Sequence, residues 1–590
     1  MIRSVVIRRR STGEAQLTGC HPVVSRLLTA RGADCKPDYD LARLLPPTLG
    51  GLDRATALIE QAIRDQQRII VVGDFDADGA TGTALAVRAL RAMGAGPVDW
   101  VVPDRFRHGY GLGETLVEEI APGKPDLLIT VDQGVSSIDG VALAKSLGIR
   151  VIVTDHHLPG DRLPEADAII NPNLDGDPFP SGALAGVGVM FYTLMALRAR
   201  LRASGWFESR AEPRLDAWLD LVALGTVADL VPLDENNRRL VHQGLSRIQA
   251  GRVNPGIAAL LELAGRNLRY VGASDLGFAA APRLNAAGRL DDMGIGVRCL
   301  LADGEASAWS HARQLDQLNS ERQAIQADMQ EAAEAQAHSL AERFGDASES
   351  IPNALCVFDD SWHQGVVGLV AGRLMERFQR PVIAFAPSEA GGDALKGSAR
   401  SPAGVHMRDL LVEIDVAHPG LIEKFGGHAR AAGLSLPRIQ LDAFSQALTN
   451  TLAGVRFDIE EVESDGALAG PDFSVEVAEA LAAAGPWGQS WPEPLFDGQF
   501  EVLDRRVVGG SHMKMRLRPV GGGPILDGIA FRAGPLCHQE LPDPLHLTFR
   551  LEINRFRGQI QVQINIQHLV SAVASSEGRS RPSNPTPAAG

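Results

Sequence analysis

The chain has 590 residues, of which 45% are hydrophobic and 22% charged, so it is too long for one hydrophobic core and typical of a multidomain globular protein. Its net charge of −15 argues against binding nucleic acid through bulk electrostatic attraction, although a local basic channel is compatible with it. The five cysteines form no CxxC pair, which argues against a disulfide scaffold or a zinc ribbon and predicts a cytoplasmic protein. No apolar run approaches the roughly 18 residues of a membrane span.

The first half of the chain alternates short apolar runs with helical stretches. Residues 1–50 are rich in Pro and Gly and predict an irregular N-terminal cap. In residues 51–304, apolar runs such as RIIVVGDF, VDWVVP, DLLITVD and RVIVTD are separated by helical segments. Short apolar runs between helices are typical of buried parallel strands. This region therefore predicts an α/β domain with a doubly wound parallel sheet.

A long helix and a second α/β pattern follow. Residues 305–344 contain neither Gly nor Pro, and we assign residues 305–345 to one connecting helix. Residues 346–456 repeat the alternation on a smaller scale, with ALCVFDD, GVVGLVAGRLMERF and RPVIAFAP in succession. They predict a second, smaller α/β domain.

The C-terminal part changes to a period of two. Within residues 457–570, the apolar residues Leu547, Phe549 and Leu551 alternate with polar ones, and a second alternating run follows. This pattern predicts an antiparallel hairpin in an all-β module, with Phe549 in its core. Residues 571–590 are of low complexity, and we expect them to be disordered.

The segment VVGDFDADGATGTA carries the strongest chemical signal. Asp74, Asp76 and Asp78 stand at alternate positions just after an apolar run, so in an extended chain they project to one side. Carboxylates that face one another repel and need cations between them. An EF-hand is the alternative for a DxDxDG string, but loop position 12 would be Leu85 in place of Glu, and a buried strand precedes the string.

Further acids and imidazoles follow later apolar runs. Asp132 follows LLITV; Asp155, His156 and His157 follow VIVT; Asp229 lies in GTVADLVPL. A lone strand-end Asp is usually a turn or capping residue. Several such residues converging on the carboxyl edge of one sheet, where α/β folds bind ligands, favour a metal site instead. Oxygen-rich ligation with one or two imidazoles suits Mn²⁺ or Mg²⁺ better than zinc.

In their order, these segments resemble the motifs of the DHH phosphoesterase superfamily. DFDADG, VDQG, TDHH and GTVADLVPL are similar to its four motifs. PRLNAAGRL, WHQGVVGLVAGRL, GSARS and FGGHARAAG resemble segments of its exonuclease branch, the last three from the accessory DHHA1 domain. The C-terminal module resembles the oligonucleotide-binding (OB) fold of bacterial exonucleases in that branch. The resemblance extends over about residues 45–568; one departure is Gln133, where relatives often carry Asn or Cys.

The resemblance implies two divalent metal ions, Mn²⁺ or Mg²⁺, that share a bridging aspartate. Asp132 corresponds to the bridge. It implies that His157 contacts phosphate or acts in acid–base catalysis, and that Asp155 orients the neighbouring imidazole. The remaining ligands then divide between the two metals, with Asp74 and Asp76 on one and Asp78, His156 and Asp229 on the other.

Other residues fit the recognition of phosphate and of a strand end. The Gly-rich segment DRFRHGYGLG offers Arg105, whose fork suits phosphate, and Tyr110, on which a base can stack; a solvated basic loop is the alternative. The other candidates come from a polar loop that we expect between helices and from the second domain. They are Arg283, Asn285 and Arg289 in the first and Ser398, Arg400 and His428 in the second.

The C-terminal module is basic within an acidic chain. Residues 505–557 hold nine basic and four acidic residues, and a β-barrel with a basic face is the usual platform for single strands. Aromatic residues are few there, so we expect backbone charge to dominate binding over base stacking.

Together, the resemblance implies a metal-dependent exonuclease that degrades single-stranded DNA from 5′ to 3′ and releases 5′-mononucleotides in recombination and repair. It implies a cytoplasmic monomer that works with single-strand-binding protein and a RecQ-type helicase. One alternative is a DHH phosphodiesterase for short oligonucleotides, cyclic dinucleotides or pyrophosphate, although such relatives lack the C-terminal module. Another is a non-catalytic scaffold, against which the retained acids and histidines argue.

Overall fold

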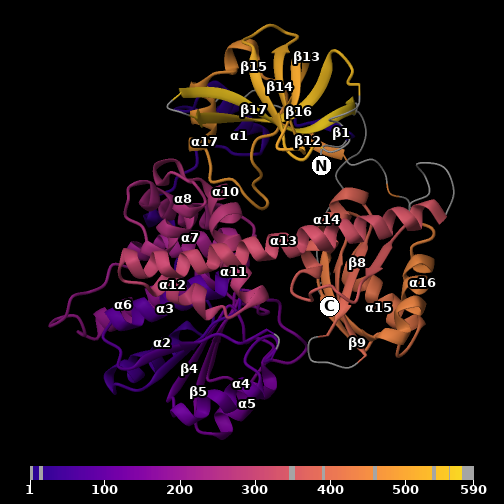
Figure 1. Cartoon of the computed structure of the whole chain (residues 1–590). Coiled ribbons are helices and arrows are strands. Elements are labelled where there is room, and N and C mark those ends of the chain that lie inside the picture. Colours follow the sequence, from indigo (N-terminus) through magenta and orange to yellow (C-terminus); the bar gives the residue numbers. More distant parts are fainter. Residues whose placement is uncertain are drawn as a thin grey trace. The chain divides into compact units, whose positions relative to one another are not determined.

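The computed structural model describes residues 4–11, 17–105, 107–343, 352–388, 393–455, 457, 461–533, 540–556 and 559–573. The chain divides into two compact units, each described here by itself (Figure 1). The larger unit comprises Tyr39–Phe457 and Pro486–Trp491; the smaller comprises Met1–Asp38, Asp458–Gly485 and Pro492–Gly590. Most of the tail predicted to be disordered, residues 574–590, lies outside the described residues.

The larger unit contains a five-stranded parallel sheet in the order β3-β2-β4-β5-β6. The predicted strands are confirmed. Because β3 and β4 lie on opposite sides of β2, the chain changes direction across the sheet at β2, and a ligand crevice is expected at the carboxyl ends of β2 and β4. The strands are β2 (Ile69–Val72), β3 (Val98–Val101), β4 (Leu127–Val131), β5 (Arg150–Thr154) and β6 (Ala168–Ile170).

Helices cover both faces of this sheet, which confirms the doubly wound fold. Alternate strand residues enter two different cores: Ile69 and Val71 pack with one set of helices, and Ile70 and Val72 pack with the other. The first set comprises α2 (Leu52–Arg64), α3 (Ala77–Ala92) and α6 (Gly186–Ala203), and the second comprises α4 (Glu114–Ile120) and α5 (Ile138–Ser146).

A helical region follows the sheet and ends in the long helix α13 (Glu305–Arg343), which confirms the prediction of one helix there. The predicted polar loop around Arg283 is wrong, because PRLNAAGRL lies in α11 (Ala281–Leu290). Pro282 stands at the start of this helix, where its missing N–H costs nothing, and Leu and Ala favour the helix. The other elements are α7 (Leu219–Ala228), α8 (Glu235–Gln249), α9 (Pro255–Leu263), α10 (Ala273–Asp275), the π-helical turn η5 (Leu276–Ala280) and α12 (Gly294–Leu301).

Short 3₁₀ helices connect several of these elements. The 3₁₀ helices of the larger unit are η1 (Leu41–Arg43), η2 (Ala121–Gly123), η3 (Leu215–Trp218), η4 (Leu268–Tyr270) and η6 (Arg438–Gln440).

Throughout the described residues, every helix is too short or too polar to span a membrane.

The second α/β region of the larger unit has a mixed sheet in the order β10-β11-β9-β8-β7. Only β7 and β8 pair in parallel, and the other pairs are antiparallel. Its strands are β7 (Leu355–Phe358), β8 (Val382–Pro387), β9 (Ala394–Arg400), β10 (Lys424–Gly427) and β11 (Ala431–Pro437). Its helices are α14 (Val367–Phe378), α15 (Met407–Ala417) and α16 (Leu441–Thr451).

The smaller unit contains a closed barrel. Strand β16 pairs with both β13 and β17, and β15 also pairs with β17, so five strands close into a ring as in an OB fold. Phe549 is fully buried, as the alternation predicts. The strands are β13 (Phe496–Val508), β14 (His512–Pro519), β15 (Leu526–Ala530), β16 (Leu545–Phe556) and β17 (Gln559–Val573), preceded by η7 (Gly470–Asp472) and α17 (Val475–Ala483).

The beginning of the chain is not an irregular cap. Strand β1 (Ser4–Arg9) pairs in parallel with β12 (Glu461–Ser464) and with β17, and helix α1 (Pro22–Ala30) follows. Val5 and Ile7 are fully buried in this arrangement. The prediction is wrong because both partners of β1 lie far along the chain, where a local sequence pattern gives no information about pairing.

Candidate metal centre

The first three aspartates lie where β2 leads into α3. Asp76 caps α3 by accepting a hydrogen bond from the Gly79 N–H at 2.9 Å, and buried Asp74 accepts one from the Phe75 N–H at 2.7 Å. Gly79 lies so close to Asp74 that a Cβ there would stand 2.5 Å from the Asp74 backbone nitrogen. Asp78 is in the first turn of α3. The helix N-terminus favours this concentration of negative charge.

Asp132 follows β4 in a strained backbone conformation, with φ of 63°. Aspartate tolerates this left-handed region better than most residues do, and backbone strain of this kind is often found at functional sites. Gly186, at the start of α6, packs against Asp132, and a Cβ at Gly186 would lie 2.4 Å from the Asp132 Cβ. The N–H groups of Gly186 and Val187 donate to Asp78 at 2.6 and 3.0 Å. Sequence reasoning missed Gly186, because a glycine in SGALAGVGV is not a ligand type.

The structure brings all six predicted metal ligands together. Three groups of side chains offer ligand atoms that lie within 4.8 Å of one another. Asp132 and His156 each occur in two of the groups, and of these two Asp132, whose carboxylate has two oxygens, is the one that can bridge metals. The groups are Asp74, Asp76 and Asp132; Asp78, His156 and Asp229; and Asp132, His156 and His157.

One contact tests whether these residues fit a metal. His156 Nε2 lies 3.0 Å from Asp132 Oδ1, yet both atoms are buried and neither has a hydrogen-bond partner. Burial, together with the charge of His157, lowers the pKa of His156 to about 4, so the ring is neutral. The ring bonds to the Leu184 backbone. Because Nε2 is unpartnered, this bond comes from Nδ1, and Nε2 turns a lone pair toward the carboxylate. A cation between the two atoms resolves the repulsion.

The carboxylates carry the same requirement for cations. Burial raises the pKa values of Asp74, Asp132 and Asp229 well above their usual range, and neighbouring carboxylates raise them further. The pKa of Asp78 rises to about 7 through burial and the charge of Asp76. Divalent cations would offset this repulsion and keep the acids ionised.

His157 forms an ion pair with Asp155 at 2.8 Å. Burial disfavours the charged form of each, but their hydrogen bond and attraction hold the pKa of Asp155 below its usual range and raise that of His157 to about 9. The Tyr110 hydroxyl lies 3.2 Å from His157 Nδ1. Asn171 and Asn173 donate to the carbonyls of His157 and His156 and hold this turn. Sequence reasoning missed both asparagines, although they come just after the apolar residues of β6.

Four guanidinium groups gather beside the acids. Burial and the charges of Arg105, Arg322 and Arg400 lower the pKa of Arg289 to about 10, while Asp76 opposes this shift. Burial also lowers the pKa values of Arg105 and Arg400. Like charges at close range are unfavourable unless an anion lies among them. The cluster is therefore suited to phosphate.

Short contacts fix the members of this arginine cluster. Arg289 Nη1 donates to the Gly365 carbonyl at 3.2 Å, and Arg400 Nη1 donates to Ser398 Oγ at 3.1 Å. The guanidinium of Arg105 stacks over the Phe75 ring at 4.2 Å. Arg322, on α13, donates to Asn319 Oδ1 at 2.7 Å, so the four arginines come from four separate segments of the larger unit and contacts within the protein hold them in place.

The remaining candidates have other contacts. Asn285 accepts from the Ala77 N–H at 2.8 Å, next to Asp76. Arg283 donates to Asp316 and to the Ala279 carbonyl, both at 2.8 Å, and His428 is exposed between β10 and β11. Gln133 is buried and its side-chain nitrogen donates to the Val72 carbonyl at 3.1 Å, so it binds the backbone at the end of β2.

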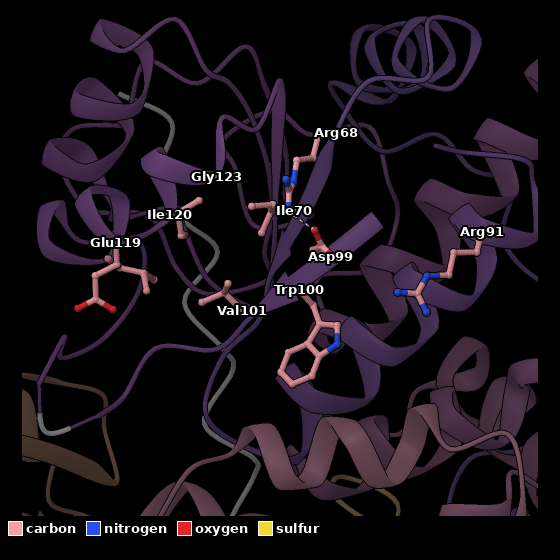
Figure 2. Close-up of a pocket in the computed structure, with 10 residues that line it drawn as sticks. Arg68, Ile70, Arg91, Asp99, Trp100, Val101, Glu119, Ile120 and Gly123 are labelled. Carbon is pink, nitrogen blue, oxygen red and sulfur yellow. Dashed lines mark hydrogen bonds and ion pairs between the residues drawn. The ribbon is translucent and has the colours of Figure 1, made fainter. Parts of the chain in front are cut away.

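The cavity drawn in Figure 2 is a different feature. It has a volume of about 490 Å³ and lies at the edge strand β3, where Trp100 and Ile120 line its apolar side. Arg68 and Asp99 form an ion pair of 2.7 Å at its wall. None of the candidate site residues lines it, so the metal centre is recognised by its chemistry and not by a cavity.

The comparisons with known proteins agree with this geometry. The model of the DHH family N-terminal domain matches residues 68–226, that of the DHHA1 domain matches 352–454 and that of the RecJ OB domain matches 464–568. The single-stranded-DNA-specific exonuclease RecJ of Dickeya dadantii (strain 3937) is 51% identical over 577 residues, which are 95% of this chain and 98% of that protein. The chain belongs to the RecJ family.

Solved RecJ structures extend the comparison to the metals. A crystal structure of RecJ from Thermus thermophilus in complex with Mn²⁺ has a TM-score of 0.79 and 31% identity and covers 97% of this chain and 81% of that one. Its complex with Mg²⁺ has a TM-score of 0.73 and 30% identity and covers 96% and 79%. These are the two metals that the sequence predicts, and the resemblance to the exonuclease branch of the DHH superfamily is confirmed in fold and domain types.

Proposed function

We propose that this chain is a metal-dependent exonuclease that degrades single-stranded DNA. The observation that carries the proposal is the pair of unpartnered buried atoms, His156 Nε2 and Asp132 Oδ1, 3.0 Å apart within a cluster of carboxylates. Relatives named single-stranded-DNA-specific exonuclease and an OB barrel in the same chain support the choice of substrate.

We propose the following division of labour at the centre. Asp132 would be shared by two divalent cations; Asp74 and Asp76 would hold one, and Asp78, His156 and Asp229 would hold the other. When bound, two such cations supply Lewis-acid activation of water and of the phosphate. Asp155 keeps His157 protonated, so that the imidazolium can donate a hydrogen bond to a phosphate oxygen or a proton to the leaving oxygen.

The direction of degradation is proposed to be 5′ to 3′, with 5′-mononucleotides as products. Two cations alone do not distinguish the ends of a strand, so direction needs a pocket for the terminal phosphate. The cluster of Arg105, Arg289, Arg322 and Arg400 lies beside Asp76 and suits that dianion. Ser398 orients Arg400, and we keep His428 and Tyr110 as peripheral candidates of this pocket.

The smaller unit is proposed to bind the strand that leaves the centre. The positive electrostatic potential of this unit is weaker than a count of its basic residues suggests, because several of them form ion pairs with acids. The pairs are Lys514 with Asp527, Arg518 with Glu501, Arg550 with Glu493 and Arg555 with Glu479. Exposed Arg506 and Arg516 on β13 and β14 are the better candidates for backbone contacts. Arg557 lies outside the described residues.

We propose that the enzyme acts in the cytoplasm as a monomer in recombination and repair, with single-strand-binding protein and a RecQ-type helicase as partners. We also propose that the boundaries given by the sequence separate functional domains: 51–304 for catalysis, 346–456 for end recognition and 457–570 for binding, with β1 added to the last. The OB barrel favours a polymer over the short oligonucleotides of the alternative DHH phosphodiesterases.

One assay tests the proposal. A 5′-labelled and a 3′-labelled single strand are digested with Mn²⁺, and product length is followed over time. We expect the 5′-labelled strand to release its label at once as a mononucleotide, and the 3′-labelled strand to become progressively shorter. The Asp132→Asn variant should leave both strands intact. Release of mononucleotide first from the 3′ label, or more than a tenth of the normal rate in Asp132→Asn, would contradict the proposal.

A further inference from the structure

Phe278 is the most exposed aromatic side chain among the described residues, with 82% of its surface accessible. It lies on η5, a single π-helical turn between α10 and α11. Single π-turns inside helices occur frequently at functional sites. Because the Phe278 ring is not packed in the protein core, it is accessible to an external partner.

The turn that carries Phe278 packs beside the metal centre. A Cβ at Gly277 would lie 3.3 Å from Val227 Cγ1, and Val227 precedes Asp229 by two residues in the sequence. Leu230 follows Asp229 directly and is itself 69% exposed, with a left-handed φ of 61°. Two large exposed apolar side chains thus belong to segments that pack against, or directly continue, the segment that carries Asp229.

The backbone that presents the ring is held firmly. Arg283 Nη1 donates to the carbonyl of Ala279, inside the π-turn, and Arg283 Nε donates to Asp316 on α13, both at 2.8 Å. These bonds fix the turn to the long helix, so the position of Phe278 is set before any ligand binds.

Helix α11 continues from the turn that carries Phe278, passes Asp76 and reaches the arginine cluster. Asn285 bonds to Ala77 beside Asp76, and Arg289 near the end of the helix belongs to the cluster. Roughly eleven residues of helix separate Phe278 from Arg289, a length of about 16 Å. Stacked nucleotides are spaced by about 3.4 Å, so this length spans about five of them, and fewer in an extended strand.

We propose that Phe278 is a stacking platform for one nucleobase of the single-stranded substrate, about three to five nucleotides from the terminal phosphate. The inference rests on the proposed function and deepens it. A base can stack on the ring only when its face is free, which is true of an unpaired strand and not of a duplex. Phe278 therefore favours single strands at a fixed distance from the end.

The test uses the full-length enzyme and 5′-phosphorylated single strands that carry one abasic residue at each of the first eight positions. In the wild type we expect kcat/KM to fall about 5- to 100-fold at one position near the third to fifth nucleotide. Phe278→Ala should show a loss of the same size on the intact strand and a flat abasic profile. Phe278→Trp should restore the profile, whereas Phe278→Leu, which is apolar but cannot stack, should not.

The control is Ile439→Ala, which removes another exposed apolar side chain (91% accessible) on η6 and should change neither rate nor profile. Thermal melting confirms that each variant is folded. An active wild type with a flat profile, or a Phe278→Leu variant equal to wild type, overturns the stacking role and leaves the proposed function standing. A wild type that does not digest any single strand overturns the proposed function itself.

Discussion

Substitution of Gly186 by Ala should damage the metal centre although no ligand is changed. The new Cβ would lie 2.4, 2.6 and 2.7 Å from the Cβ, Oδ1 and Cα of Asp132. The Cα is part of the strained Asp132 backbone and the Cβ is bonded to it, so neither atom can move away freely. Overpacking of this kind costs about 1–3 kcal/mol. An entropy of unfolding of about 2.1 cal/mol/K per residue makes each kcal/mol worth only about 1 °C in a unit of this size, so the melting temperature of the larger unit should fall by about 1–3 °C.

The same displacement should weaken metal binding, because Asp132 Oδ1 is the atom that faces His156 Nε2. We expect the Mn²⁺ concentration for half-maximal activity to rise at least tenfold, as measured by titration with a short oligonucleotide substrate. Gly188→Ala is the matched control on the same helix, since its Cβ meets only the end of the Leu184 side chain at 3.2 Å. If Gly186→Ala and Gly188→Ala require the same Mn²⁺ concentration, the close approach of α6 does not position Asp132.

Four further outcomes are expected. Arg400→Ala should lower kcat/KM on 5′-phosphorylated strands by about tenfold to a hundredfold and shrink the preference over 5′-hydroxyl ends, which a competition assay measures. Exposed Arg506 and Arg516 should each contribute about 0.7 to the slope of log K against log salt for strand binding, so Ala variants should flatten that slope in fluorescence titrations. Point variants are preferred to deletion of the whole C-terminal module from residue 470, because such a deletion also removes Pro486–Trp491, which belong to the larger unit. Asp497→Asn should lower the melting temperature of the smaller unit at neutral pH, and the difference should shrink as the pH falls below about 4. A non-hydrolysable 5′-phosphorylated strand should lower the Kd for Mn²⁺ in calorimetry, and an unchanged Kd would disprove coupling between the two sites.

The sign of the Asp497 prediction follows from its contacts. Burial would raise the pKa of this carboxyl, but hydrogen bonds from His546, Arg9 and Ser464 outweigh burial and hold the pKa well below its usual range. A carboxyl with a lowered pKa in the folded protein contributes stability above its unfolded pKa of about 3.9, and this stability is lost as the pH falls through the folded value. Acid unfolding monitored by circular dichroism should therefore be steeper in the wild type than in Asp497→Asn.

The metal ligands could be predicted from the sequence because two local signals coincide. Short apolar runs mark the parallel strands, and acids or imidazoles follow the runs that become β2, β4 and β5. Since parallel strands end at one edge, position along the chain is enough to bring Asp76, Asp132 and His156 together. Asp229 follows helix α7, so this rule does not place it; it is a candidate only as one more acid after an apolar stretch, and the resemblance of GTVADLVPL to a family motif strengthens its assignment.

Features that depend on distant partners could not be predicted. The pairing of β1 with β12 and β17 has no local signal, and the same is true of the packing of Gly186 against Asp132. Alternation also overstates burial at the ends of strands: Ile560 keeps the period of the core residues but is 52% exposed beside the hairpin end. Arg283 looked like a phosphate ligand in the sequence, yet its partners are Asp316 and a backbone carbonyl.

The candidate site holds two clusters of opposite charge that do not neutralise each other. Burial raises the pKa values of the acids and lowers those of Arg105, Arg289 and Arg400; like charges add to the shift at Asp132 and Arg289, while the acids partly offset it at Arg105. A sequence that only had to be stable would pair these charges directly. Rigid elements keep them apart instead: β2 and β4 carry the acids, α11 and β9 carry the arginines, and Phe75 holds Arg105 by its ring. Under the proposed function, cations would relieve one cluster and a terminal phosphate the other, and a phosphodiester that reaches the cations would extend from that phosphate. The free energy of binding both ligands would then align one scissile bond.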